Sequence, residues 1–235
     1  MRHKTTDSPT TARPFASTCV AILTIALPFL SACGGDDFGE NVRVPQSKHQ
    51  NVVGPLETGT TLTLPGDKPF NLTDAQRNSR GAAAASSSAD PAGTASCVAD
   101  AFRGGSADAA FQVGHVLNYD ASSPFAARVT FHVTYECSLT NAYADSGKLE
   151  LGLKAYVMDS DHRVIGRVLL ASADLDRTPS RWTGSESPSF DVTLQPKTAY
   201  HLVVAAQVKA ETKEEPGPTA TVYVKSLTID VTPAS

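Results

Sequence analysis

The side chains best suited to chemistry are few and scattered along this 235-residue chain. It has four cysteines and six histidines, and the histidines do not cluster in sequence. The motifs HExxH, GxSxG, CxxC and the phosphate-binding P-loop are all missing. We therefore predict a protein that is not an enzyme, with no catalytic residues, no metal and no cofactor.

Two pairs of closely spaced carboxylates suggest calcium ligands. Asp159 and Asp161 form one pair, and Asp174 and Asp176 form the other. Aspartate is also common in turns, and the strand predicted between the two pairs would hold them roughly 30 Å apart. They cannot share one ion, so we interpret both pairs as turn residues.

The N-terminal region has the three zones of a secretory signal. A basic leader over residues 2–13 precedes the apolar run VAILTIALPF at 20–29, and small residues follow at 31–32. The run is too short to cross a bilayer, which requires about 20 apolar residues. A basic region, a short apolar region and small residues at the cleavage point predict a signal peptide over residues 1–32.

Leu30-Ser31-Ala32-Cys33 resembles the lipobox of bacterial lipoproteins. The resemblance implies cleavage before Cys33, diacylglycerol (palmitate-type acyl chains) on its sulfur and anchoring of the mature protein to a membrane of the cell envelope. In Gram-negative members an aspartate after the cysteine often retains the protein in the inner membrane. Gly34 occupies that position here, which favours the outer membrane if the host is Gram-negative. The alternative is an ordinary secretory signal with a chance cysteine.

The remaining cysteines suggest a disulfide. Cys19 would leave with the signal peptide and Cys33 would carry lipid, so Cys97 and Cys137 remain. Export implies an oxidising compartment, which predicts a Cys97–Cys137 bond. Two free thiols or a metal-binding pair are the alternatives.

Composition separates a linker from a domain. Residues 33–95 are poor in large apolar side chains, and 81–90 reads GAAAASSSAD, so we predict a lipidated cysteine followed by a flexible linker. Residues 96–235 alternate apolar and polar side chains with the period of two that is typical of strands. We predict seven strands near residues 111–119, 126–137, 148–158, 163–171, 189–195, 199–210 and 219–232.

Seven alternating strands in one domain predict an all-β fold, an antiparallel β-sandwich. The stretch from Leu194 to Val204 resembles the corner of fibronectin type III and Ig-like sandwiches, in which a tyrosine hydroxyl, here that of Tyr200, bonds back to the upstream backbone. The resemblance implies a seven-stranded Ig-like order, with a jelly roll as the alternative. A phase slip near 225–226 predicts a β-bulge.

The same alternation places three histidines. His115 is in phase with the predicted core, which favours a buried structural residue. His132 and His201 are out of phase with the core and are expected on the outer surfaces of two different sheets.

The candidate binding surface lies in the predicted loops at one pole of the sandwich. It comprises Tyr143, Arg177, Arg181 and Trp182, the last being the only tryptophan. An aromatic residue in such a loop either forms a platform for a glycan or protein partner or caps the core.

These features predict a lipid-anchored, non-catalytic β-sandwich that binds or displays at the bacterial cell envelope. The alternatives are a carbohydrate-binding jelly-roll module and a structural envelope component without a ligand. The expected partners are the membrane, through lipid on Cys33, and a glycan or envelope protein. Nucleic acid is not expected, because the net charge is −4 and nucleic-acid binding favours a basic patch.

Overall fold

The computed structural model describes residues 51–53, 59–140, 147–174, 180–213 and 217–234. All thirteen secondary-structure elements in this part of the chain are strands. No helix among these residues is long and apolar enough to cross a membrane. Cys33 and the predicted signal peptide lie outside the described residues.

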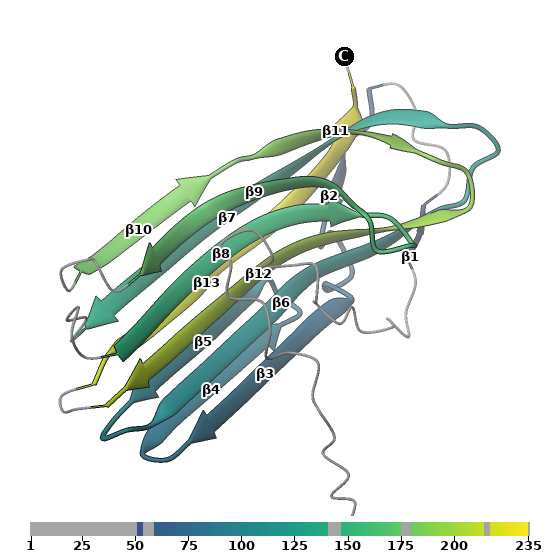
Figure 1. Cartoon of the computed structure of the whole chain (residues 1–235). Coiled ribbons are helices and arrows are strands. Elements are labelled where there is room, and N and C mark those ends of the chain that lie inside the picture. The colour runs from purple at the N-terminus through teal and green to yellow at the C-terminus, as the bar shows by residue number, and fades with distance from the viewer. Residues whose placement is uncertain (1–50, 54–58, 141–146, 175–179, 214–216, 235) are drawn as a thin grey trace, which may run out of the picture.

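The strands form two sheets packed face to face (Figure 1). Sheet A has the order β1-β6-β12-β8-β9, with β3 also paired to β6, and sheet B has the order β10-β7-β13-β5-β4, with β11 on β7 and β2 on β13. Sheet A contains β1 (Asn51–Val53), β3 (Leu72–Arg80), β6 (Ser106–Tyr119), β8 (Gly147–Met158), β9 (Val164–Asp174) and β12 (Thr198–Thr212). Sheet B contains β2 (Leu62–Leu64), β4 (Ala83–Asp90), β5 (Thr94–Ala101), β7 (Phe125–Thr140), β10 (Ser180–Glu186), β11 (Ser189–Leu194) and β13 (Thr219–Pro233).

The antiparallel pairs are nested in the sequence: each successive pair lies, along the chain, between the two strands of the pair before it. Strand β5 pairs with β13, β6 with β12, β7 with β10 and β11, and β8 with β9. The innermost hairpin turns at Asp159, whose Oδ1 accepts hydrogen bonds from the backbone N–H groups of Asp161 and Arg163, each at 2.9 Å. The turn interpretation of this acidic pair is therefore confirmed, whereas Asp176 lies outside the described residues.

The core fills the space between the inward faces of the two sheets. Strands occupy all seven expected positions, and the predicted alternation of burial is clearest in β7, where Val129, Phe131 and Val133 are buried and His132 is exposed. In β9 the inward side chains of Val168 and Leu170 are only partly buried. The largest fully buried side chains include Phe111, Tyr119, Phe131 and Tyr200. Removal of this apolar surface from water is the main stabilising contribution to such a fold.

The predicted flexible linker is wrong for residues 62–64, 72–80, 83–90 and 94–95, which form β2, β3, β4 and the start of β5. The low-complexity stretch conceals an alternation with period two. Ala83, Ala85 and Ala89 are partly buried against the core, while Ala84 and the serines at 86 and 88 are exposed. Pairing with β6 and β5 supplies the stability that the small side chains of this stretch cannot supply alone.

All seven predicted strands are present, but their order is not that of an Ig-type sandwich. There the first strand shares a sheet with the second, whereas here the corresponding strands β6 and β7 lie in different sheets and β6 pairs with β12. The additional strands explain the difference, since β5 provides the outer partner of β13 that the prediction lacked.

Two local predictions are confirmed. The hydroxyl of Tyr200 accepts a hydrogen bond from the Gln195 N–H at 2.7 Å and donates one to the Thr193 carbonyl at 3.3 Å. The register between β13 and β7 shifts between Val224 and Ser226, where the bulge was expected.

Candidate functional site

The structure does not place the predicted binding residues in loops at one pole of the sandwich. Tyr143 and Arg177 lie outside the described residues. Arg181 and Trp182 belong to strand β10 rather than to a loop, and β10 pairs with β7 along its whole length. Successive side chains of a strand point to opposite faces, so Arg181 and Trp182 cannot form one surface.

Trp182 points inward. It lies opposite Cys137 of β7 and packs, partly buried, against the core. This geometry favours the capping interpretation over the platform interpretation. The signal missed in the sequence was the alternation in Arg181-Trp182-Thr183, which marks a strand.

The predicted Cys97–Cys137 disulfide is also wrong, because both thiols are free and buried. Cys97 of β5 and Cys137 of β7 each lie opposite Val222, on either side of β13. Two strand spacings separate their backbones by roughly 10 Å, beyond the 7 Å that a disulfide allows. Burial raises the pKa of both thiols, that of Cys137 to about 12, so both stay protonated and unreactive.

A shallow depression on the outward face of sheet B contains Arg181 together with residues of β7 and β13. Its volume is about 540 Å³, within the range of small-ligand sites. The depression, called the sheet B groove below, is lined by Glu136, Ser138, Leu139, Thr140, Arg181, Thr221 and Tyr223.

Glu136 is the electrostatic centre of this groove. Its side chain is only 11% exposed and forms ion pairs with two cations, Arg181 through Oε1 and Lys225 through Oε2, the latter at 2.6 Å. The hydrogen bond from Lys225, followed by that from Arg181, lowers the pKa of Glu136 below its ordinary value. The carboxylate therefore remains charged near neutral pH and holds two cations beside it, Arg181 in the lining of the groove and Lys225 next to the groove on β13.

Tyr223 supplies an aromatic surface beside these charges. It lies directly opposite Glu136 across the β13–β7 pair and is 43% exposed, which makes it one of the few large apolar side chains that face solvent. Ser138, Thr140 and Thr221, three residues with hydroxyl groups, line the same depression. An exposed ring beside charged and hydroxyl groups can stack on the apolar face of a sugar while binding its hydroxyls.

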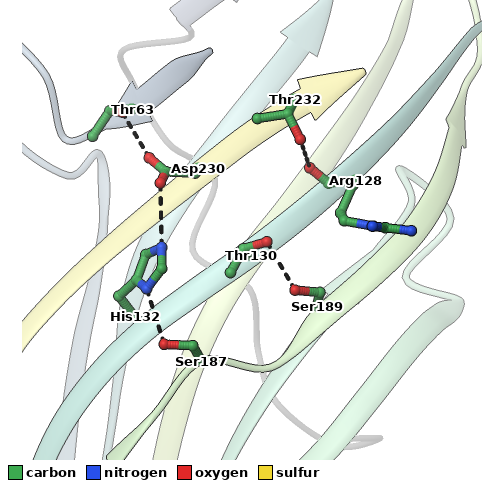
Figure 2. A network of polar contacts seen from close by, with 8 residues as sticks. All are labelled: Thr63, Arg128, Thr130, His132, Ser187, Ser189, Asp230 and Thr232. Carbon is green, nitrogen blue, oxygen red and sulfur yellow. Dashed lines mark hydrogen bonds and ion pairs between the residues drawn. The ribbon is translucent and has the colours of Figure 1, made fainter. Parts of the chain in front are cut away.

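Further along sheet B, Figure 2 shows a chain of hydrogen bonds that contains a serine, a histidine and an aspartate. Ser187 Oγ lies 3.0 Å from His132 Nδ1, and His132 Nε2 lies 3.2 Å from Asp230 Oδ2. Asp230 Oδ1 accepts a hydrogen bond of 2.6 Å from the Thr63 hydroxyl.

The chain differs from a hydrolase triad, in which a buried carboxylate orients the histidine and separate donors stabilise the oxyanion. The side chains of His132 and Asp230 are 45% and 30% exposed on the outward surface of the sheet. They join β7 and β13 to β2 through Thr63 and to the β10–β11 connection through Ser187 (Figure 2). We interpret the group as a structural link between strands.

The histidine predictions are confirmed. His115 is fully buried on the core face, where its ring meets that of Phe70 edge-on at 6.3 Å, and burial lowers its pKa to about 4. His132 lies on the outward surface of sheet B and His201 on that of sheet A. In the described part of the chain, no three histidine, cysteine or acidic side chains are grouped so as to hold a metal ion.

The sequence missed Glu136, Tyr223 and Lys225 as site residues. Glu136 and Tyr223 are out of phase with the neighbouring core residues of their strands, which predicts only that they face outward, and Lys225 lies at the bulge where the phase changes. Their proximity depends on the pairing of β13 with β7, two strands that are far apart in sequence.

No family model matches this sequence, and it has no significant match among curated proteins. Among solved structures, the chain is similar to a family 11 carbohydrate-binding module from Clostridium thermocellum in complex with a mixed-linked tetrasaccharide, with 8% identity, a TM-score of 0.26 and coverage of 68% of this chain and 89% of that one. A xylan-binding domain from Paenibacillus barcinonensis matches with 10% identity, a TM-score of 0.24 and coverage of 77% and 100%.

A protein of infectious bursal disease virus, Gt strain, matches with 7% identity, a TM-score of 0.28 and coverage of 74% of this chain. This chain spans only 33% of the length of that protein. At TM-scores this low, the similarity gives no information about ligands.

Proposed function

We propose that this protein is a bacterial cell-envelope lipoprotein, anchored through lipid on Cys33, whose β-sandwich binds glycans in the sheet B groove without catalysing a reaction. The single observation that supports glycan binding is the exposed Tyr223 ring beside the Glu136–Arg181–Lys225 charge cluster. The lipobox resemblance supports the anchor and, through Gly34, an outer-membrane location if the host is Gram-negative.

We also infer that the sandwich is a jelly roll. A jelly roll is a long antiparallel hairpin rolled into two sheets, with eight strands in two Greek keys. The nesting of β5 with β13, β6 with β12, β7 with β10–β11, and β8 with β9 agrees with this description. In this interpretation β10 and β11 together form one interrupted strand, and β1 to β4 are additions to the sheet edges.

The groove has the properties that sugar recognition requires. Sugars present both apolar C–H faces and many hydroxyls, so their sites combine an aromatic surface with fixed polar groups. Glu136 already holds Arg181 and Lys225 in place, so little side-chain entropy would be lost when a ligand binds. The open shape of the groove favours a chain of sugars over a small enclosed ligand.

The test of glycan binding is a glycan array probed with the mature chain and two variants. Tyr223→Ala should abolish the signal, while Tyr223→Phe should retain most of it because stacking needs the ring and not the hydroxyl. Both variants should melt within a few degrees of the wild type, since the side chain faces solvent. Equal binding by wild type and Tyr223→Ala, or no glycan signal at all, would refute the proposal.

The anchor is tested separately. Metabolic labelling with a fatty acid should mark the wild-type protein, and Cys33→Ser should leave unlabelled precursor. Cys97→Ser is the matched control, because it removes a cysteine that no lipobox precedes. Label that persists on Cys33→Ser would exclude lipidation at this position.

The second candidate is a display or structural role with an envelope protein as partner. The same charged groove favours it, because a mixed acidic and basic rim suits a protein surface. A pull-down from an envelope fraction distinguishes the two. Capture of an envelope protein that survives removal of glycans and is lost in Arg181→Glu would favour a protein partner. Turnover of any glycan by the protein would contradict the non-catalytic assignment.

A further inference from the structure

The three charged side chains at the sheet B groove are exposed to very different degrees. The side chain of Glu136 is 11% exposed, whereas those of its two partners, Arg181 and Lys225, are 73% and 51% exposed. Two basic groups and one acidic group give this cluster a net charge of +1, although the net charge of the whole chain is −4. A molecule that approaches the groove therefore meets the positive groups before it meets the carboxylate.

Both oxygens of the Glu136 carboxylate already have a partner. Oε1 pairs with Nη2 of Arg181 and Oε2 with Nζ of Lys225, and the hydrogen bonds from Lys225 and Arg181 lower the pKa of Glu136. No other acidic side chain is present among the described residues that line the groove. The cations, in contrast, have more N–H groups than these contacts use, because a guanidinium has five and an ammonium three. The charged groups of the groove are thus better equipped to donate hydrogen bonds to a ligand than to accept them.

This imbalance favours an anionic ligand. A guanidinium binds a carboxylate through two parallel N–H bonds, which gives the contact both strength and a defined orientation. The ion pair with Glu136 shows that a carboxylate fits against the guanidinium of Arg181 from the protein side. The exposed part of Arg181, with Lys225 as a second positive charge, can bind a ligand carboxylate from the solvent side.

Tyr223 is close enough to contact the same ligand. It lies on β13 directly opposite Glu136 of β7, and β10, which carries Arg181, pairs with the other edge of β7. Because the guanidinium of Arg181 reaches Glu136, its positive charge lies roughly 5 Å, one strand spacing, from β13. A single sugar unit can therefore stack on the Tyr223 ring while its charged group contacts Arg181.

We propose that the sheet B groove selects acidic glycans, chains of sugars that carry a carboxylate on the ring as uronic acids do. Arg181 binds the carboxylate, Lys225 adds a second positive charge, and Tyr223 stacks on the sugar ring. In a uronic acid the carboxylate is bonded directly to the ring, which suits the short separation between Tyr223 and the guanidinium, whereas a sulfate ester carries its charge further from the ring. This inference rests on the proposed glycan-binding function and specifies the class of ligand.

Another ion pair on the same sheet provides a comparison. Arg128 of β7 donates hydrogen bonds to Asp191 of β11 through Nε and Nη2, at 2.8 and 3.2 Å. Here the carboxylate is the more exposed partner, at 63% against 43% for the arginine, and the pair has no net charge. Arg128 also lies roughly 27 Å along β7 from Glu136. An acidic glycan gains nothing at this pair, so Arg128 serves as a matched control for Arg181.

The test measures binding of the mature chain to pairs of glycans that differ only in charge. Each uronic-acid oligosaccharide, such as an oligomer of galacturonic acid, is compared with its carboxyl-reduced form, in which every carboxylate has become a primary alcohol. The acidic member should bind at least about tenfold more tightly, the effect expected for one charge-assisted hydrogen bond. Equal binding of both members of every pair, or equally tight binding of a sulfated neutral glycan, would overturn the inference while glycan binding itself stands. No signal from any glycan would overturn both.

Three variants test the assigned residues. Arg181→Gln should weaken binding of the acidic oligosaccharide at least about tenfold, Lys225→Gln should weaken it several-fold, and Arg128→Gln should bind like the wild type. All three side chains are substantially exposed, so each variant should melt close to the wild type. Increasing salt should weaken binding by the wild type, because exposed charges are screened, and should have less effect on Arg181→Gln. Unchanged binding in Arg181→Gln, or an equal loss in Arg128→Gln, would contradict the proposal.

Discussion

At the scale of single residues, the interior of the sandwich tolerates a polar group where the backbone provides its partner. Tyr200 is 2% exposed, yet its hydroxyl contacts a donor and an acceptor in the connection between β11 and β12. His115 differs from Tyr200 because it is a titratable base. Burial lowers its pKa to about 4, so the ring stays neutral. These two residues lead to separate predictions.

Tyr200→Phe should reduce the free energy of unfolding by about 1–2 kcal/mol, because it leaves the Gln195 N–H and the Thr193 carbonyl without their buried partner. Urea unfolding followed by circular dichroism measures the change. The control is Tyr223→Phe, which removes a hydroxyl from an exposed ring and should stay within about 0.5 kcal/mol. Equal effects in the two variants would show that the corner does not stabilise the fold.

His115 should make the protein less stable in acid. Its folded pKa of about 4 lies below the ordinary value of 6.5, so the unfolded chain binds a proton first. The stabilisation is complete above pH 6.5 and is lost as pH falls toward 4, with a maximum of roughly 3 kcal/mol. Unfolding measured at pH 7 and pH 4.5 should show a smaller difference in His115→Gln than in wild type, and equal differences in the two proteins would contradict the prediction.

At the scale of the element, the edge strand β10 has one face toward solvent and the other toward the core. Arg181 points outward and pairs with Glu136, and Trp182 points inward against the core. Gly184, further along the strand, lies where an added Cβ would come within 2.2 Å of the Tyr135 ring. Because side chains alternate along β10, Arg181 lines the sheet B groove while its neighbour Trp182 packs against the core.

Trp182→Ala should cost about 3 kcal/mol of unfolding free energy, at the lower end for large aromatic truncations because the ring is only partly buried. Arg181→Ala, its neighbour, should cost less than about 1 kcal/mol, since its side chain is 73% exposed. Thermal unfolding of the two variants in parallel distinguishes them. A loss for Trp182→Ala no larger than that for Arg181→Ala would mean that the ring does not cap the core.

At the scale of the whole molecule, the fold is a set of nested pairs closed at its edges by the N-terminal strands. β3 covers the edge of β6, β4 covers that of β5, and β2 adds to β13 (Figure 1). Leu64, Phe70 and Leu72, which precede the predicted domain boundary at residue 96, are almost completely buried. An unpaired strand edge invites association with other chains, so these strands protect the sandwich as well as extending it.

Truncation tests this directly. A fragment of residues 59–235 should unfold cooperatively, whereas a fragment of residues 96–235 should melt at a lower temperature and aggregate, because it exposes the edges of β5 and β6 and removes three buried side chains. Calorimetry and light scattering on both fragments measure the difference. Equal melting temperatures and monomeric behaviour would show that residues 59–95 are dispensable.

By itself, the sequence determined the features that depend on neighbouring residues. Alternation with period two defined all seven predicted strands, the phase slip located the bulge, and the stretch around Tyr200 identified the corner. The period also assigned each histidine to an inward or outward face. Local geometry is sufficient for such predictions because it depends only on the strand repeat.

The tertiary structure alone decided which strands are neighbours. Cys97 and Cys137 were expected to bond because nothing in the sequence indicated that β13 lies between them. Glu136 and Tyr223 form one site because that same strand, far downstream of β7 in the sequence, pairs beside it. Residues 83–90 became a strand only through pairing, since alanine and serine have little intrinsic tendency to form sheets without a partner to pack against.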